Sequence, residues 1–103
     1  MEPGVVDNPE RSRFEIHEGD GGDVAGFVAY ELQGDEIIFL HTEIDARHEG
    51  RGLGGRLVRA ALDAARDDGL SVLPYCPFVR GWIERHPAYM SLVREEQRSR
   101  YGW

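Results

Sequence analysis

Lysine is absent from this chain of 103 residues, and all twelve of its basic residues are arginine. We interpret that absence as a coding bias, although arginine also suits bidentate contacts to phosphate. The acidic residues number 19 and leave a net charge of −7. Because nucleic acids and anionic membranes are bound by basic faces, this balance argues against either as a general partner. Cationic partners remain compatible with it.

Cysteine and long apolar runs are also scarce. The single cysteine, Cys76, excludes an internal disulfide and any cysteine-cluster metal site, and we expect no metal centre. The longest strongly apolar run, from Ile37 to Leu40, is too short to span a membrane. The acidic, polar N-terminus carries no secretory signal, so we expect a soluble cytoplasmic protein.

What the chain does contain fits one compact domain. A length of 103 residues is too short for two domains, and a hydrophobic content of 41% is sufficient for a core. Residues 1–11 have no periodicity, and residues 94–103 are increasingly polar and charged. We therefore expect a flexible tail over residues 1–11 and a polar C-terminal tail over residues 94–103, on either side of a domain that covers residues 12–93.

Alternating apolar and polar residues predict an antiparallel meander of three strands joined by short glycine-containing turns. The predicted strands cover residues 13–18, 24–32 and 36–44, and the turns cover 19–22 and 33–35. From Arg51 the apolar residues instead recur along one face of a helix, which a left-handed cap at Gly69 ends.

A short strand over 71–76 and a second helix over 78–86 complete the pattern. Strand, helix and strand in this order give a parallel pair with a right-handed crossover. We therefore predict the α+β (α/β) class, with a mixed, mostly antiparallel sheet that contains one β-α-β crossover.

A glycine-rich loop, Arg47–Gly55, joins the third strand to the first helix. Glycines let consecutive backbone N–H groups turn into one small volume, and the start of a helix adds the positive end of its dipole. Four arginines lie between Arg47 and Arg59, against the single acid Glu49. A loop of this kind is suited to a phosphate or a pyrophosphate.

Three interpretations of the loop differ in the ligand they imply. Gly50-x-Gly52-x-x-Gly55 matches a dinucleotide fingerprint, but a Rossmann unit needs a longer, wholly parallel sheet. A Walker A loop fails because no Gly-Lys-Ser/Thr follows the glycines. Taken from Arg47, the pattern Arg-x-x-Gly-x-Gly resembles the acetyl-coenzyme A motif of the GNAT superfamily of N-acetyltransferases.

The resemblance extends over roughly Phe14 to Val93 and includes three further segments. These are Leu40–Glu43 before the loop, Pro74–Phe78 after the first helix, and Ile83–Pro87 near the end. It implies a compact acyl-CoA N-acyltransferase-like fold, in which acetyl-coenzyme A lies in a wedge between two parting parallel strands. The cofactor-binding residues implied are Ile44, Asp45, Arg47, His48, Gly50, Arg51, Gly52, Leu53, Gly54 and Gly55.

Two candidate bases lie on the strand before the loop. Strict alternation places Ile37, Phe39, His41 and Glu43 on one face, and Ile38, Leu40, Thr42 and Ile44 on the other. His41 or Glu43 would then deprotonate an ammonium nucleophile near the carboxyl end of the strand. The alternatives are a half-buried structural histidine and a solvated strand-end carboxylate.

Cys76 is the third catalytic candidate. Pro77 suits the first position of a helix, which makes Cys76 its N-cap, and a helix N-terminus lowers the pKa of a thiol. The thiol could protonate a departing thiolate or carry an acetyl group between donor and acceptor. The alternative is a small buried hydrophobe.

The resemblance has two departures that bear on function. Ile83 stands where the superfamily usually has a tyrosine acid, and no helical segment precedes the first strand to build an acceptor pocket. We expect transfer of acetyl from acetyl-coenzyme A to a primary amine of a small molecule or a basic protein or peptide, by a monomer or weak homodimer. The alternatives are a catalytically idle acyl-coenzyme A binding or sensing module and, more weakly, a dinucleotide-binding fragment.

Overall fold

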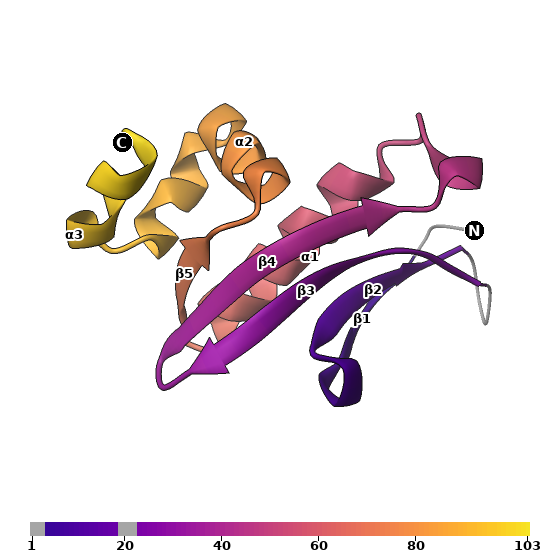
Figure 1. Cartoon of the computed structure of the whole chain (residues 1–103), viewed down its shortest axis with the longest axis horizontal. Coiled ribbons are helices and arrows are strands. Elements are labelled where there is room, and N and C mark those ends of the chain that lie inside the picture. The colour runs from indigo at the N-terminus through magenta and orange to yellow at the C-terminus, as the bar shows by residue number, and fades with distance from the viewer. Residues whose placement is uncertain (1–3, 19–22) are drawn as a thin grey trace.

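A computed structural model describes residues 4–18 and 23–103 of the chain (Figure 1). One sheet holds five strands in chain order, and all neighbours pair antiparallel except the last two, which are parallel. The strands are β1 (Gly4–Asn8), β2 (Arg13–His17), β3 (Val24–Gln33), β4 (Glu36–Ile44) and β5 (Ser71–Pro74). This arrangement confirms the mixed, mostly antiparallel sheet; the turn predicted at 19–22 lies outside the described residues.

Helices follow β4 and β5 along the chain. The α-helices are α1 (Leu53–Asp67), α2 (Pro77–Arg85) and α3 (Glu95–Arg98). Short 3-10 helices are η1 (Pro9–Arg11), η2 (Ala46–His48), η3 (Pro87–Leu92) and η4 (Ser99–Tyr101). Helix α1 connects the parallel pair β4 and β5, as predicted, and lies behind the sheet in Figure 1. Among the described residues, none of the helices is long and apolar enough to cross a membrane.

Glycines set both ends of α1. Gly69 has a φ of +71° and ends the helix where the sequence predicts. At the other end Gly50 and Gly52 have φ values of +82° and +72°, which no helical residue adopts. The helix therefore begins at Leu53 rather than at Arg51.

The core lies between the sheet and the apolar face of α1. Leu57 and Leu62 of α1 are fully buried, and so are Ile16 and Val28 on the strands opposite. No helix of the described residues crosses the near face of β2, β3 and β4 in Figure 1. The sheet thus has one face covered by helices and one helix-free face.

Both end segments of the chain contact the domain over the residues described. Residues 4–8 form β1, which pairs with all of β2, and the Tyr30 hydroxyl donates to Asp7 at 2.6 Å. Pro9 is compatible with this strand because it begins η1 and does not interrupt β1. At the other end Trp103 packs partly buried against the core and donates to Glu84 at 2.9 Å. Partial burial of this aromatic residue therefore joins the end of the polar C-terminal segment to the domain.

A β-bulge in β4 overturns the predicted alternation of that strand. Ala29 pairs with His41 whereas Tyr30 pairs with Phe39, which leaves Leu40 as an extra residue. A one-residue insertion reverses the faces of all residues beyond it. Phe39 and Thr42 therefore share the helix-covered face, and His41 and Glu43 lie on the helix-free face instead.

Candidate functional site

The parallel strands β4 and β5 part after four paired positions. Their register runs from Glu36 with Ser71 to Phe39 with Pro74. The last link is the Cys76 N–H, which donates to the Phe39 carbonyl at 2.9 Å. Beyond it β4 continues to Ile44 while the chain turns away into α2, as Figure 1 shows. The edge of β4 beyond Phe39 therefore has no β5 partner within the described residues, and a wedge opens between the two segments.

A cavity of about 400 Å³, here called the glycine-loop pocket, lies on the helix-covered side of this wedge. Its lining residues are Thr42, Ile44, His48, Glu49, Gly50, Gly52, Leu53, Gly54, Gly55 and Phe78. Of the predicted cofactor-binding residues, Asp45, Arg47 and Arg51 do not line it. The pocket therefore combines the end of β4, the glycine loop and the first turn of α1.

The start of α1 presents free backbone donors to this pocket. Gly52 precedes the helix and supplies no side-chain cap, and the first intrahelical bond runs from the Arg56 N–H to the Gly52 carbonyl at 3.3 Å. The N–H groups of Leu53, Gly54 and Gly55 are therefore left without helical acceptors. Together with the helix dipole they form a site for an anion.

Phe78 closes one side of the pocket through contact with Gly54. A Cβ on Gly54 would lie 2.6 Å from the Phe78 ring, so only glycine allows this approach. The ring remains 42% exposed although it belongs to the first turn of α2. Phe78 therefore forms part of the wall of the glycine-loop pocket.

The arginines of the loop itself are already paired. Arg47 binds Asp45 through its Nε and Nη2 atoms at 3.1 and 3.0 Å. Hydrogen bonds from Arg47 lower the pKa of Asp45 to about 2, so this carboxylate is ionised at neutral pH. Arg51 binds Glu18 at 2.6 Å, and the His48 ring lies 3.6 Å from the same carboxylate. Arg47 and Arg51 therefore face acids of this chain rather than the pocket.

Cys76 lies at the root of the wedge, where β4 and β5 separate. It is the N-cap of α2 with Pro77 at the first helical position, as the sequence predicts, and it is only 3% exposed. Its Sγ lies 3.3 Å from the Thr42 hydroxyl, which lines the glycine-loop pocket. The thiol thus lies between β4 and the N-terminus of α2, and the Thr42 side chain separates it from the glycine-loop pocket.

His41 and Glu43 lie together but not with Cys76. Their Nε2 and Oε1 atoms are 3.4 Å apart, and both side chains are 61% exposed on the helix-free face. The His41 ring meets the edge of Phe27 with centroids 6.2 Å apart. Because the bulge turns this pair away from Thr42, strand β4 separates the two bases from the thiol.

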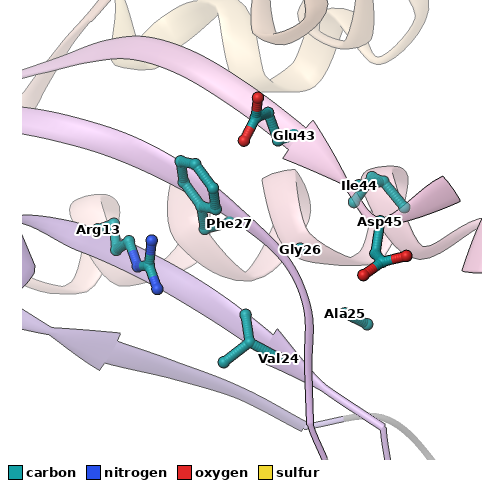
Figure 2. Close-up of a pocket in the computed structure, with 8 residues that line it drawn as sticks. All are labelled: Arg13, Val24, Ala25, Gly26, Phe27, Glu43, Ile44 and Asp45. Carbon is teal, nitrogen blue, oxygen red and sulfur yellow. The ribbon is translucent and has the colours of Figure 1, made fainter.

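A second cavity, the open-face pocket, has a volume of about 420 Å³ on the helix-free face (Figure 2). Its lining residues are Arg13, Val24, Ala25, Gly26, Phe27, Glu43, Ile44 and Asp45. Ile44 also lines the glycine-loop pocket, so the two cavities lie on opposite sides of the end of β4. Arg13 and Phe27 were not predicted as site residues; they meet Glu43 only through strand pairing, which no local motif encodes.

Neither the residue at the position of the superfamily tyrosine nor the nearby Tyr89 brings a hydroxyl to the wedge: Tyr89 is engaged with Asp63. Ile83, at the position of the superfamily tyrosine, is fully buried. The Tyr89 hydroxyl donates to Asp63 at 2.8 Å, and this bond together with burial raises the pKa of Tyr89. No group of three or more potential metal-ligating side chains occurs among residues 4–18 and 23–103. Neither Ile83 nor Tyr89 therefore supplies an acid to the wedge.

Comparison with known proteins agrees with this geometry. The family model of the GCN5-related N-acetyltransferases matches residues 13–92. Protein NATD1 from human is 32% identical over 68 residues, which cover 65% of this chain and 60% of that protein. The zebrafish Protein NATD1 is 26% identical over 92 residues, which cover 86% of this chain and 83% of that protein. The chain thus spans about three fifths of the length of the mammalian relatives it matches.

The architecture also matches a solved structure. The NMR solution structure of a GCN5-like protein from Staphylococcus aureus superimposes with a TM-score of 0.67, at 21% identity, over 88% of this chain and 87% of that one. At this identity the likeness establishes the fold. The family match and the parting strands together establish the class: this chain belongs to the GCN5-related N-acetyltransferase family.

Proposed function

We propose that this protein transfers an acetyl group from acetyl-coenzyme A to a primary amine. The observation that carries the proposal is the wedge between β4 and β5, which has the uncapped start of α1 at its mouth and the Cys76 thiol at its root. One end suits a pyrophosphate and the other places a proton-bearing sulfur beside the strand edge.

Within this proposal the cofactor lies along the edge of β4. The N–H groups of Leu53, Gly54 and Gly55 hold the pyrophosphate, and the unpaired edge of β4 from Thr42 to Ile44 offers strand-like hydrogen bonds to the amide groups of the pantetheine arm. Phe78 covers the helix start and excludes water from this side. Acetyl-coenzyme A supplies the thioester on which the reaction depends.

In the transfer step the amine nitrogen attacks the thioester carbonyl, the C–S bond breaks and coenzyme A leaves as its thiolate. Cys76 either protonates this thiolate or first accepts the acetyl group as a nucleophile and then passes it to the amine. The Thr42 hydroxyl orients the sulfur in both cases, because the two atoms are 3.3 Å apart.

The acceptor approaches from the helix-free face. His41 and Glu43 are exposed there, and Glu43 also lines the open-face pocket. Either group takes a proton from the ammonium on this face, before the amine enters the wedge beside Thr42 and Cys76. Of the charged residues that line that pocket, Asp45 is paired with Arg47, and Arg13 is paired with Glu15. The Glu43 carboxylate is therefore the group that favours a cationic acceptor such as a small amine or a basic peptide.

A second candidate function is an acyl-coenzyme A binding module without catalysis. One specific observation favours it: Ile83 is fully buried where the superfamily has its tyrosine acid. In this case the wedge binds the cofactor as described, and His41 and Glu43 are solvated surface charges.

Steady-state transfer separates these candidates. Acetyl-coenzyme A is incubated with a panel of polyamines, amino acids and basic peptides, and released thiol and acetylated amine are both quantified. Acetylated product that disappears in Cys76→Ala supports the transferase. Tight coenzyme A binding with no product on any amine supports the binding module, and binding of NAD without coenzyme A would contradict both.

A further inference from the structure

Two buried polar atoms face each other beside the glycine-loop pocket. They are Oε2 of Glu18, just after β2, and Nδ1 of His48, at the end of η2, and neither has a hydrogen-bond partner among the residues described. The two atoms are 3.6 Å apart, and the His48 side chain is only 16% exposed. Two lone pairs that face each other in a buried place cost free energy, so this arrangement requires a proton between them.

The proton between these atoms belongs to the ring. Arg51 donates to Oε1 of Glu18 at 2.6 Å, so this carboxylate is ionised and Oε2 is the oxygen left for His48. An ionised carboxylate only accepts hydrogen bonds, which places the proton on Nδ1. The neutral form of His48 is therefore the Nδ1–H tautomer, and its Nε2 atom carries a lone pair.

This neutral tautomer does not suit an anionic ligand. His48 lines the glycine-loop pocket together with Gly54 and Gly55, whose N–H groups are free at the start of α1. Because Nδ1 is turned to Glu18, Nε2 is the ring nitrogen left for a ligand, and its lone pair repels a phosphate oxygen. A second proton converts Nε2 into a charged donor, which attracts that oxygen.

The charges around His48 nearly balance. Those of the described residues are Glu18, Asp45 with its partner Arg47, Glu49 of the pocket lining, and Arg51. The three acids favour the imidazolium, whereas the two arginines and the positive end of α1 oppose it. Strand β4 and helix α2 contribute only uncharged side chains to the pocket, namely Thr42, Ile44 and Phe78. A bound anion therefore shifts the balance towards the imidazolium.

We infer that the protein binds its cofactor together with a proton, which His48 takes up on Nε2. The inference rests on the proposed function, because the anion is the pyrophosphate held at the start of α1. The proton comes from solvent and returns to it when coenzyme A leaves. Imidazole is the side chain whose charge changes between pH 5 and 8, so cofactor affinity rises as the pH falls through this range. Deprotonation of the amine acceptor has the opposite dependence on pH.

Isothermal titration calorimetry with 3′-dephospho-coenzyme A tests the linkage. This ligand keeps the pyrophosphate and lacks the phosphomonoester, which would itself titrate near about pH 6. Titrations in two buffers of different ionisation enthalpy should show uptake of about half a proton per ligand near pH 7, and the affinity should fall about five- to tenfold from pH 6 to pH 8. His48→Gln should abolish both effects. His41→Gln removes an imidazole from the opposite face of β4 and should change neither.

The tautomer is tested without any ligand. The imidazole ¹⁵N chemical shifts at pH 8 should show His48 of the wild type in the Nδ1–H form. Glu18→Ala removes the acceptor and should move the ring to the Nε2–H form, in a protein whose unfolding temperature is checked in parallel. An Nε2–H form in the wild type would overturn the assignment of the proton.

The outcomes separate this linkage from the proposed function. Binding without proton uptake, or uptake that persists in His48→Gln, would overturn the linkage and leave the proposed function standing. Proton uptake at His48 without transfer to any amine would retain the linkage and contradict the proposed catalysis. Absence of binding by both coenzyme A and its dephospho form would contradict both.

Discussion

The Thr42 hydroxyl and the Cys76 thiol face each other at 3.3 Å across the point where β4 and β5 separate. The two residues are separated by 34 positions in the chain, and only the bulge at Leu40 turns Thr42 towards the thiol. The bulge therefore does two things at once. It brings a hydroxyl to the only cysteine of the chain, and it moves His41 to the opposite face.

The first prediction concerns the contact between Thr42 and Cys76. Thr42→Val keeps the shape of the side chain and removes its hydroxyl, so the transfer rate should fall up to about tenfold while coenzyme A affinity is unchanged. Cys76→Ala should reduce the rate by at least about 100-fold, as expected for the loss of an acid or a nucleophile. Single-turnover kinetics with coenzyme A titrations measure both; an unchanged rate in Cys76→Ala removes the thiol from the mechanism.

Intact-mass spectra distinguish the two roles of the thiol. Incubation with acetyl-coenzyme A alone should add one acetyl group if Cys76 is a nucleophile, and the adduct should vanish when a reactive amine is added. If the thiol is only an acid, the wild type stays unmodified although transfer proceeds. A stable adduct that persists in Cys76→Ala would assign the modification to another side chain.

The contact between Gly54 and Phe78 makes the second prediction. Gly54→Ala places a methyl group 2.6 Å from the ring, so the variant should be destabilised by about 1–3 kcal/mol or lose cofactor affinity as the ring moves. Gly55→Ala is the matched control, because its nearest neighbour would be 3.5 Å away. That variant should instead be as stable as the wild type or gain about 0.5–1 kcal/mol from helix propensity. Urea unfolding measures both.

A double variant checks the cause of the effect. Gly54→Ala combined with Phe78→Ala removes the clash and should recover the stability lost in Gly54→Ala alone. If the double variant is less stable than the sum of the two single changes, the loss comes from the backbone at Gly54 rather than from the ring.

The third prediction concerns Glu18, which contacts two residues of the glycine loop. It binds Arg51 at 2.6 Å and lies 3.6 Å from His48, which lines the glycine-loop pocket. Glu18→Gln removes a negative charge beside an anion site and frees Arg51, so coenzyme A should bind several-fold more tightly at low salt. The gain should shrink as the salt concentration rises. Weaker binding would show instead that Glu18 positions the loop.

The fourth prediction concerns acid stability. Glu15 is 5% exposed; burial alone would raise its pKa, but hydrogen bonds from Arg13, Asn8 and His17 outweigh burial and lower it from 4.5. Because the pKa of Glu15 is lower in the folded state, the carboxylate stabilises the fold fully at pH values above the pKa that it has in the unfolded chain. This stabilisation is lost as the pH falls through the lower pKa of the folded state. Arg13→Gln should therefore make the protein lose stability at a higher pH than the wild type as the solution is acidified. Glu15→Gln should make the unfolding temperature depend less on pH. Thermal unfolding between pH 3 and 6 measures both effects.

Local signals predicted much of this architecture. Gly69 ends α1 and Cys76 caps α2 because a positive φ and a proline at the first helical position act within a few residues. The period of the apolar residues identified the central strands and both long helices. The glycine loop together with the segments Leu40–Glu43, Pro74–Phe78 and Ile83–Pro87 indicated the family from local sequence alone.

The remaining features depend on long-range contacts. The bulge at Leu40 exists only in the register of β4 with β3, and strict alternation therefore placed His41 and Glu43 on the wrong face. Glu18 binds Arg51 although 33 positions separate the two residues in the chain. The sequence therefore predicted that Arg51 binds the cofactor, whereas in the fold its side chain is paired with Glu18.

The central claim is that the wedge and the glycine loop form the acetyl-coenzyme A site, and a two-dimensional ¹⁵N–¹H NMR titration tests it most directly. Acetyl-coenzyme A should shift the backbone signals of Thr42–Ile44, His48–Gly55 and Cys76–Phe78, while those of β1 remain in place. Gly54→Ala should abolish or weaken these shifts. Signals that move only around the open-face pocket, or not at all at millimolar ligand, would contradict the account.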